Sequence, residues 1–131
     1  MAVELPILMK TFEAAADLST KQYYYVKLTS TFNRVNVCTA ATDIPIGVLQ
    51  NKPDAAGKAA EVMMVGITKG SANGALSILD LVGPSADSQV DAKVPGTDIT
   101  EYVVGQVLEA ATAAADIITM TVNCLNPHRA A

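Results

Sequence analysis

The sequence is poor in charged residues, has a single histidine and contains no long apolar run. Only 17% of its 131 residues are charged, whereas about 25% is usual for a soluble domain. Hydrophobic residues make up 50%, which excludes a disordered chain, because disorder requires low hydrophobicity and high net charge. The net charge of -4 argues against a nucleic-acid binder, because such a protein needs a basic surface that the sequence does not provide. The length suits one domain with a core of its own.

Membrane-spanning and signal segments are also missing. The longest apolar stretches, residues 44–49, 62–67 and 102–108, end well short of the roughly 18 residues that a membrane span needs. The N-terminus has no basic segment followed by an apolar one, so we predict no signal peptide and expect the protein to stay in the compartment where it is made. A chain with so many apolar residues and so few charged ones is predicted to cover part of its surface by assembling with other subunits.

Residues that could carry enzyme chemistry are few and scattered. His128 stands beside Pro127 in a C-terminal tail that we expect to be flexible, and a flexible tail cannot hold a general base in place. Residues 66–70 are too short for a phosphate-binding loop. Cys38 and Cys124 lack any metal-binding or redox spacing, and we interpret them as buried free thiols. A disulfide between them would require a fold that places their Cα atoms within about 7 Å. The sequence therefore predicts no enzyme, no cofactor, no metal site and no small-molecule substrate.

Alternation of polar and apolar residues with period two predicts an all-β protein. Segments rich in Gly, Pro and Asp separate the alternating stretches and read as turns. An alanine-rich segment, residues 109–115, is either a helical turn or a loop. The predicted strands are residues 23–29, 34–39, 44–49, 61–67, 89–94, 102–108 and 116–122, with an apolar mixed segment at 75–82.

A weak internal repeat relates the two halves of the chain. Residues 46–65 resemble residues 104–120, since each copy has a short strand, an alanine-rich connection and a second strand. Each copy also places a glycine inside the first strand, Gly47 and Gly105, which indicates a bulge or a close backbone approach. The repeat predicts a duplicated hairpin that closes into a small barrel or sandwich.

The N-terminal segment fits two structures. Leu5, Leu8 and Phe12 fall at helical spacing, and Pro6 is tolerated in a first helical turn. Residues 9–13 also alternate as a strand does. Periodicity alone leaves helix and strand equally open.

Three consecutive tyrosines, Tyr23, Tyr24 and Tyr25, could stack on the bases of a single-stranded nucleic acid. The negative net charge disfavours that role, and period-two geometry turns at least one of the rings toward the core. We interpret them as core and interface residues.

Several short segments, taken together and in order, resemble the phage capsid decoration (cement) proteins. The resemblance covers about residues 9–122 and departs from the family at residues 71–82, where the usual Gly-Asp-Leu-Val phrase reads ILDLV. The segments are KTFEA (10–14), ADLSTKQY (16–23), IGVLQN (46–51), AAEV (59–62), GITK (66–69), YVVG (102–105), LEAA (108–111) and DII (116–118).

The resemblance implies a small β-tulip fold and a homotrimer on the outside of an icosahedral bacteriophage head. There the protein would stabilise the expanded capsid by bridging major capsid protein subunits, after synthesis in the host bacterial cytoplasm. One alternative is another β-rich phage component, such as a tail or head-completion ring protein. A second is a small β-barrel enzyme or ligand carrier, which would need a convergent polar cluster for which the sequence offers no candidate residues. No membrane or nucleic-acid partner is expected.

The resemblance also implies an extended N-terminal arm, which favours a strand over a helix there. We expect the arm at residues 1–17, a single β-rich domain at 18–125 and a flexible tail at 126–131. The predicted contacts with the capsid or with other subunits are Val3, Leu5, Ile7, Leu8, Met9, Phe12, Tyr23 and Tyr25.

Overall fold

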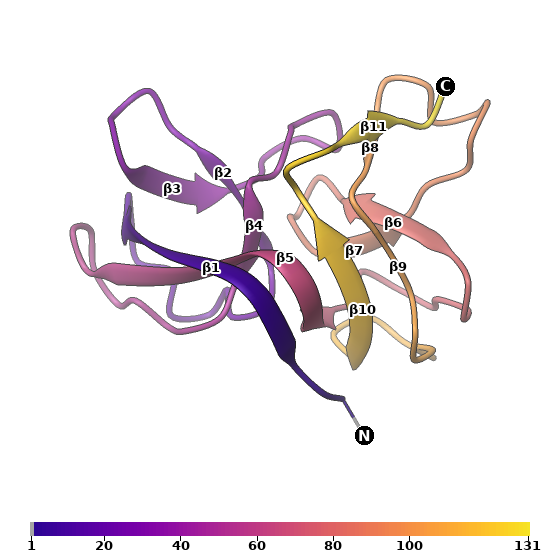
Figure 1. Ribbon diagram of the computed structural model, residues 1–131, viewed down its shortest axis with the longest axis horizontal. Coiled ribbons are helices and arrows are strands. Elements are labelled where there is room, and N and C mark those ends of the chain that lie inside the picture. Colours follow the sequence, from indigo (N-terminus) through magenta and orange to yellow (C-terminus); the bar gives the residue numbers. More distant parts are fainter. Residues whose placement is uncertain (1) are drawn as a thin grey trace.

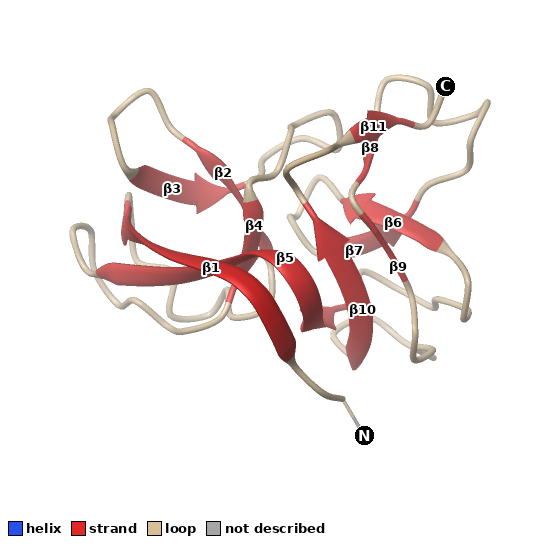
Figure 2. Cartoon of the chain, in the orientation of Figure 1, coloured by secondary structure: helices blue, strands red, loops and turns tan. Residues whose placement is uncertain are grey.

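The computed structural model describes residues 2–131, which form β-strands and loops without a helix (Figures 1 and 2). The predicted all-β class is therefore confirmed. In the described part of the chain no helix is long and apolar enough to cross a membrane. The strands are β1 (Leu5–Ala14), β2 (Tyr25–Leu28), β3 (Arg34–Val37), β4 (Gly47–Leu49), β5 (Ala59–Ser71), β6 (Leu81–Pro84), β7 (Val90–Ala92), β8 (Tyr102–Val103), β9 (Gly105–Gln106), β10 (Ile117–Asn123) and β11 (His128–Arg129).

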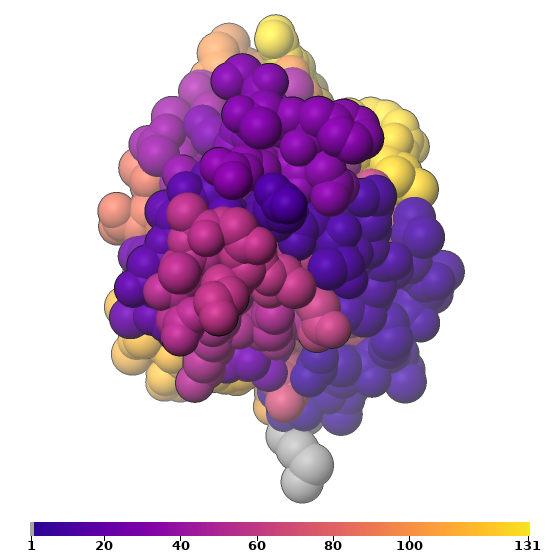
Figure 3. Space-filling model, turned by 90° about the vertical axis from the view of Figure 1, so that its left-hand side faces the viewer, coloured from indigo at the N-terminus to yellow at the C-terminus, as the bar shows by residue number. Residues whose placement is uncertain are grey.

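The first five strands close into a small barrel. β1 pairs antiparallel with β5 and, at its last two residues, parallel with β3. β3 then pairs with β2, β2 with β4, and β4 with β5, which completes the ring. This barrel forms the left half of Figure 1 and faces the viewer in Figure 3. The segment that had helical and strand alternatives is thus a strand.

The second half of the chain is built on the far end of β5. β10 pairs with β5 over residues 65–71, beyond the point where β4 leaves it. β6, β7 and β9 form a three-stranded sheet, and β8 pairs with β11. β5 and β10 lie side by side where the two halves meet (Figure 1). One long strand therefore belongs to both halves.

Two hydrophobic cores lie on opposite faces of the central strands. One core takes residues from all five barrel strands and from Leu18, so it fills the barrel. The other lies between the barrel and the second half. Successive side chains of a strand point to opposite faces, so neighbouring residues supply both cores. The pairs, with the second-core residue first, are Tyr25 and Val26, Val48 and Leu49, and Met63 and Val62.

The two glycines of the internal repeat stand where backbones meet closely, as predicted. A Cβ on Gly47 would lie 2.4 Å from Val62 Cγ1, and one on Gly105 would lie 2.0 Å from the Thr121 carbonyl oxygen. The strand that contains Gly47 pairs with β5. Val107, which directly follows the strand that contains Gly105, forms a bridge with Met120 of β10. No side chain fits at either position without displacing a strand.

The C-terminal segment is held in the fold, contrary to the predicted flexible tail. β11 pairs with β8. The Ala130 backbone N–H donates to the Glu101 carbonyl, and the Ala130 carbonyl accepts from Gly96 N–H. Ala130 itself is buried. The sequence-based prediction considered composition alone and missed these long-range backbone hydrogen bonds.

Candidate contact surface

The first half of β1 exposes apolar side chains on both faces of the strand. Ile7 is 80% exposed, and Leu5, Leu8 and Met9 are exposed as well. β5 pairs with one edge of β1, whereas β3 reaches the other edge only at the last two residues. Within the described chain, residues 5–12 therefore have one edge without a paired strand. Monomeric proteins avoid an apolar strand with an open edge, because it invites another chain.

A β-bulge explains why Ile7 projects from the ladder. Pro6 pairs with Gly66 and Leu8 pairs with Val65, so Ile7 is an extra residue on β1. Gly66 has a φ of 144, and a Cβ there would lie 2.7 Å from the Leu5 carbonyl oxygen. A bulge bends and twists its strand. The glycine thus lets β1 cross β5 closely while Ile7 turns outward.

Segments of the second half that also carry exposed apolar side chains are joined to the start of the chain by hydrogen bonds. The Val3 N–H donates to Thr119 Oγ1 at 3.0 Å, and the Leu108 N–H donates to the Thr119 carbonyl at 2.9 Å. The Leu79 N–H donates to the Val107 carbonyl at 3.1 Å. These bonds join the start of the chain, the loop before β10 and the turn before β6. We call the exposed side chains along them the basal surface: Val3, Leu5, Ile7, Leu8, Met9, Ile78, Leu79, Leu108 and Ile117.

The turn before β6 holds Leu79 in an unusual conformation. Its φ is 82, in the left-handed region that leucine rarely adopts, and its side chain is 72% exposed. The Ser77 N–H donates to Asp80 Oδ2 at 2.9 Å, and the Asp80 N–H donates to the Ser77 carbonyl at 3.1 Å. Strain of this kind gathers at functional sites. Sequence reasoning missed this residue, and the one signal was the departure from the family pattern at residues 71–82.

Five of the eight predicted contact residues lie on this surface, and Phe12, Tyr23 and Tyr25 do not. Phe12 is 6% exposed and Tyr25 is 0% exposed. β1 turns Phe12 into the barrel, and β2 turns Tyr25 into the second core. The prediction that these two contact another molecule is therefore wrong for the folded chain. Tyr23 is half-buried, with the Lys69 ammonium 5.7 Å from the centre of its ring.

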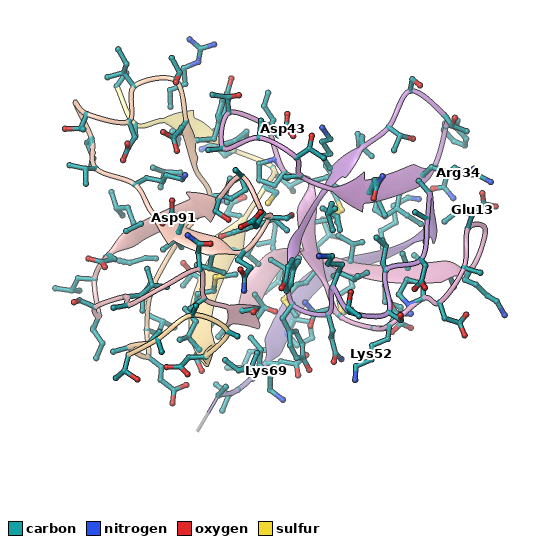
Figure 4. All side chains as sticks on the ribbon, turned by 180° about the vertical axis from the view of Figure 1, so that it is seen from behind. Glu13, Arg34, Asp43, Lys52, Lys69 and Asp91 are labelled. Carbon is teal, nitrogen blue, oxygen red and sulfur yellow. The ribbon has the colours of Figure 1, made fainter. Side chains whose placement is uncertain are left out.

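Apart from local ion pairs and the cluster of Lys93 with Asp91 and Glu101, the charged side chains of residues 2–131 lie apart. The labelled residues in Figure 4 lie apart around the molecule, except for Glu13 and Arg34, which form an ion pair of 3.3 Å. Among residues 2–131 no group of three or more His, Cys, Asp or Glu side chains is placed to hold a metal. Exposed ion pairs contribute little to stability. We therefore expect apolar side chains, and not charged ones, to supply most of the contact with another molecule.

One carboxylate is nonetheless held firmly by its surroundings. Burial raises the pKa of Asp43, but the Lys27 ammonium at 2.7 Å and the backbone N–H groups of Thr39 and Ala40 outweigh it and lower the pKa overall. Asp43 thus closes the loop between β3 and β4.

Cys38 and Cys124 are both free and buried, as predicted. Burial raises the pKa of each thiol to about 12. Both are therefore protonated at neutral pH and poor nucleophiles.

No protein-family model matches the sequence, and no curated protein matches it. Solved structures do match. One is a crystal structure of the head fiber gp8.5 N base in bacteriophage phi29, with a TM-score of 0.65. The match covers 89% of this chain and 94% of that chain at 17% sequence identity. The two chains share a fold.

Proposed function

We propose that this chain is a structural protein of a bacteriophage head. It binds the outside of the shell as a homotrimer and stabilises the expanded shell by bridging major capsid protein subunits. The observation that carries the proposal is the fold shared with the phi29 head fiber base over nearly the whole of both chains. The segments that resemble capsid decoration proteins support the same location. The proposed role requires no catalysis and no cofactor.

The basal surface suits a protein that acts by adhesion. Full burial of one large apolar side chain contributes about 1.5–3 kcal/mol. The exposed side chains of β1 alone, among them Leu5, Ile7 and Met9, could therefore supply several kcal/mol to a contact. A protein that makes its contacts only with the expanded shell stabilises that state by mass action.

The open edge of β1 supplies a second kind of contact. An extended segment of the major capsid protein can add to residues 5–12 as a further strand. The backbone N–H and C=O groups on that edge of β1 face no paired strand in the described chain. Apolar side chains on both faces of β1 would then pack against the shell. We assign this edge to the capsid.

A second candidate follows from the description of the structural neighbour, which is the base of a head fiber. This chain would then fix a longer fibre to the head. The two functions differ in what lies on the outer side of the domain. A fibre base would carry a fibre there, whereas a decoration protein would carry none.

Electron cryo-microscopy of heads with and without the chain tests the location. We expect trimeric density on the outer shell of complete heads alone. Heating the same two samples tests stabilisation, and depleted heads should release DNA at a lower temperature. Equal release temperatures would exclude the stabilising role, and density confined to the tail or the portal region would exclude the location.

Two matched variants test the surface. Ile7→Ser should lower the occupancy of the heads, whereas Ile99→Ser, at an exposed apolar residue away from the basal surface, should not. Equal occupancy of the two variants would remove the basal surface from the proposal.

A further inference from the structure

Phe32 differs from every other aromatic residue of the described chain. It is 95% exposed, at the turn between β2 and β3. Tyr25 is buried in the second core. The others each lie beneath a cationic side chain: Phe12 under Lys10, Tyr23 under Lys69, Tyr24 under Lys21 and Tyr102 under Arg129. Phe32 is thus the one aromatic ring left wholly to solvent in residues 2–131.

The turn that carries Phe32 is tied to the barrel. The Glu13 N–H donates to the Asn33 carbonyl at 2.8 Å, and Lys10 Nζ donates to Asn33 Oδ1 at 2.5 Å. The Thr29 N–H donates to the Arg34 carbonyl at 3.1 Å and closes the hairpin. The backbone beside Phe32 is therefore fixed on both sides. An aromatic side chain on a fixed backbone loses little entropy on binding and is a typical interface hot spot.

An apolar groove lies beside the same hairpin. Its volume is about 450 Å³, and Leu28, Ile44, Pro45 and Ile46 give it apolar walls. Leu28 is 53% exposed and Ile44 is 52% exposed, so the walls face solvent. The Lys27 ammonium, paired with Asp43, lies in the groove lining. The Lys27–Asp43 pair is neutral as a whole, so the groove complements Phe32 through its apolar walls.

Phe32 and the groove belong to the same part of the chain, since Lys27 and Leu28 of the groove lining stand on β2, which leads into the turn that carries Phe32. A head-to-tail contact forms a closed ring only if the rotation between copies closes. Two complementary features close together in the fold favour a ring of few copies, whereas features at opposite ends favour a filament.

We propose that Phe32 of one copy inserts into the groove of the next copy and that this contact builds the trimer. The inference rests on the proposed function for the number of copies. The basal surface then remains free for the shell.

Removal of the ring tests the contact in solution. Phe32→Ser should raise the dissociation constant of the trimer at least about 30-fold for each Phe32 that is removed from a groove. Sedimentation velocity over a concentration series measures it. Ile99→Ser is the matched control, since it also removes an exposed apolar side chain, and it should leave the trimer unchanged. A Phe32→Ser trimer as tight as the parent would overturn the proposal.

Cysteine cross-linking tests the geometry directly. A chain with Phe32→Cys and Ile44→Cys should give covalent trimers on mild oxidation, while a mixture of the two single variants should give covalent dimers. Cys38 is buried, whereas Cys124 also lines the groove, so the cross-linking variants carry Cys124→Ala as well. If the parent chain is monomeric in solution, the same oxidation is done on assembled heads. Absence of covalent trimers in both settings would overturn the contact.

The two proposals fail differently. A chain that trimerises through Phe32 but does not bind heads would overturn the proposed function alone. A chain that binds and stabilises heads, with Phe32→Ser as tight a trimer as the parent, would overturn this inference alone.

Discussion

Lys93 Nζ lies 2.5 Å from Glu101 Oε1, and the Lys93 side chain is fully buried. A second carboxylate, Asp91, lies 3.5 Å from the same ammonium. Lys93 follows β7 and Glu101 precedes β8, so the pair closes the intervening loop against the second half.

Removal of Glu101 should destabilise the fold more than removal of Lys93. Glu101→Gln leaves a buried ammonium with only the more exposed Asp91, and we expect a loss of about 2–3 kcal/mol in the free energy of unfolding. Lys93→Met removes the buried charge and should cost less. Urea denaturation of both variants measures the difference. Equal losses would show that the buried charge is not what matters.

Gly105 should not tolerate a side chain. A Cβ there would lie 2.0 Å from the Thr121 carbonyl oxygen, so Gly105→Ala must push β9 away from β10, and we expect a loss of about 2 kcal/mol or more. Gly74→Ala is the matched control, because a Cβ at Gly74 meets nothing within 4 Å. Its effect should stay within about 0.5 kcal/mol. Thermal melts of the two variants check this, and similar melting temperatures would contradict it.

Acid should weaken the loop before β10. The backbone N–H of Thr112, then that of Ala113 and the Thr112 hydroxyl, lower the pKa of Asp116 from its ordinary 3.8. A lowered pKa stabilises the fold above pH 3.8 and loses that contribution as the pH falls through the folded value. Asp116→Asn should thus lower the melting temperature at pH 7 and make little difference near pH 2. A constant difference across this range would rule the carboxylate out as the cause.

The buried thiols should resist alkylation. Because burial raises the pKa of Cys38 and Cys124 to about 12, almost no thiolate is present at pH 8. Iodoacetamide should label the native chain far more slowly than the urea-unfolded chain, as followed by intact mass. Fast labelling of the native protein would mean that the second core opens readily.

The sequence predicted what depends on local pattern. Alternation located most strands, and the glycines of the repeat marked close contacts because only glycine fits there. Leu5, Ile7, Leu8 and Met9 of β1, which the sequence predicts as contact residues, are exposed, and their contacts stay a prediction. What the sequence could not show depends on distant partners. Ala130 is buried by hydrogen bonds to residues 96 and 101, which a polar tail sequence does not indicate.

The inward turn of Phe12 and the exposure of Leu79 have the same origin. Phe12 follows a run of exposed residues on β1, and only the closure of the barrel decides that it faces the core. Leu79 stands in an apolar segment that would suit a buried strand, but its backbone adopts a left-handed turn. Phe32 lies in a hairpin turn, where the alternation of polar and apolar residues does not indicate whether a side chain is exposed.

The sharing of β5 between barrel and second half has a consequence for how the molecule comes apart. Its residues contribute to both cores, and its ladder joins β1, β4 and β10. If β5 separates from one half, the other half loses its pairing with β5 as well, so we expect neither half to remain folded alone. Denaturation should proceed in one cooperative step, and a force applied along β5 would shear many hydrogen bonds at once instead of unzipping them singly.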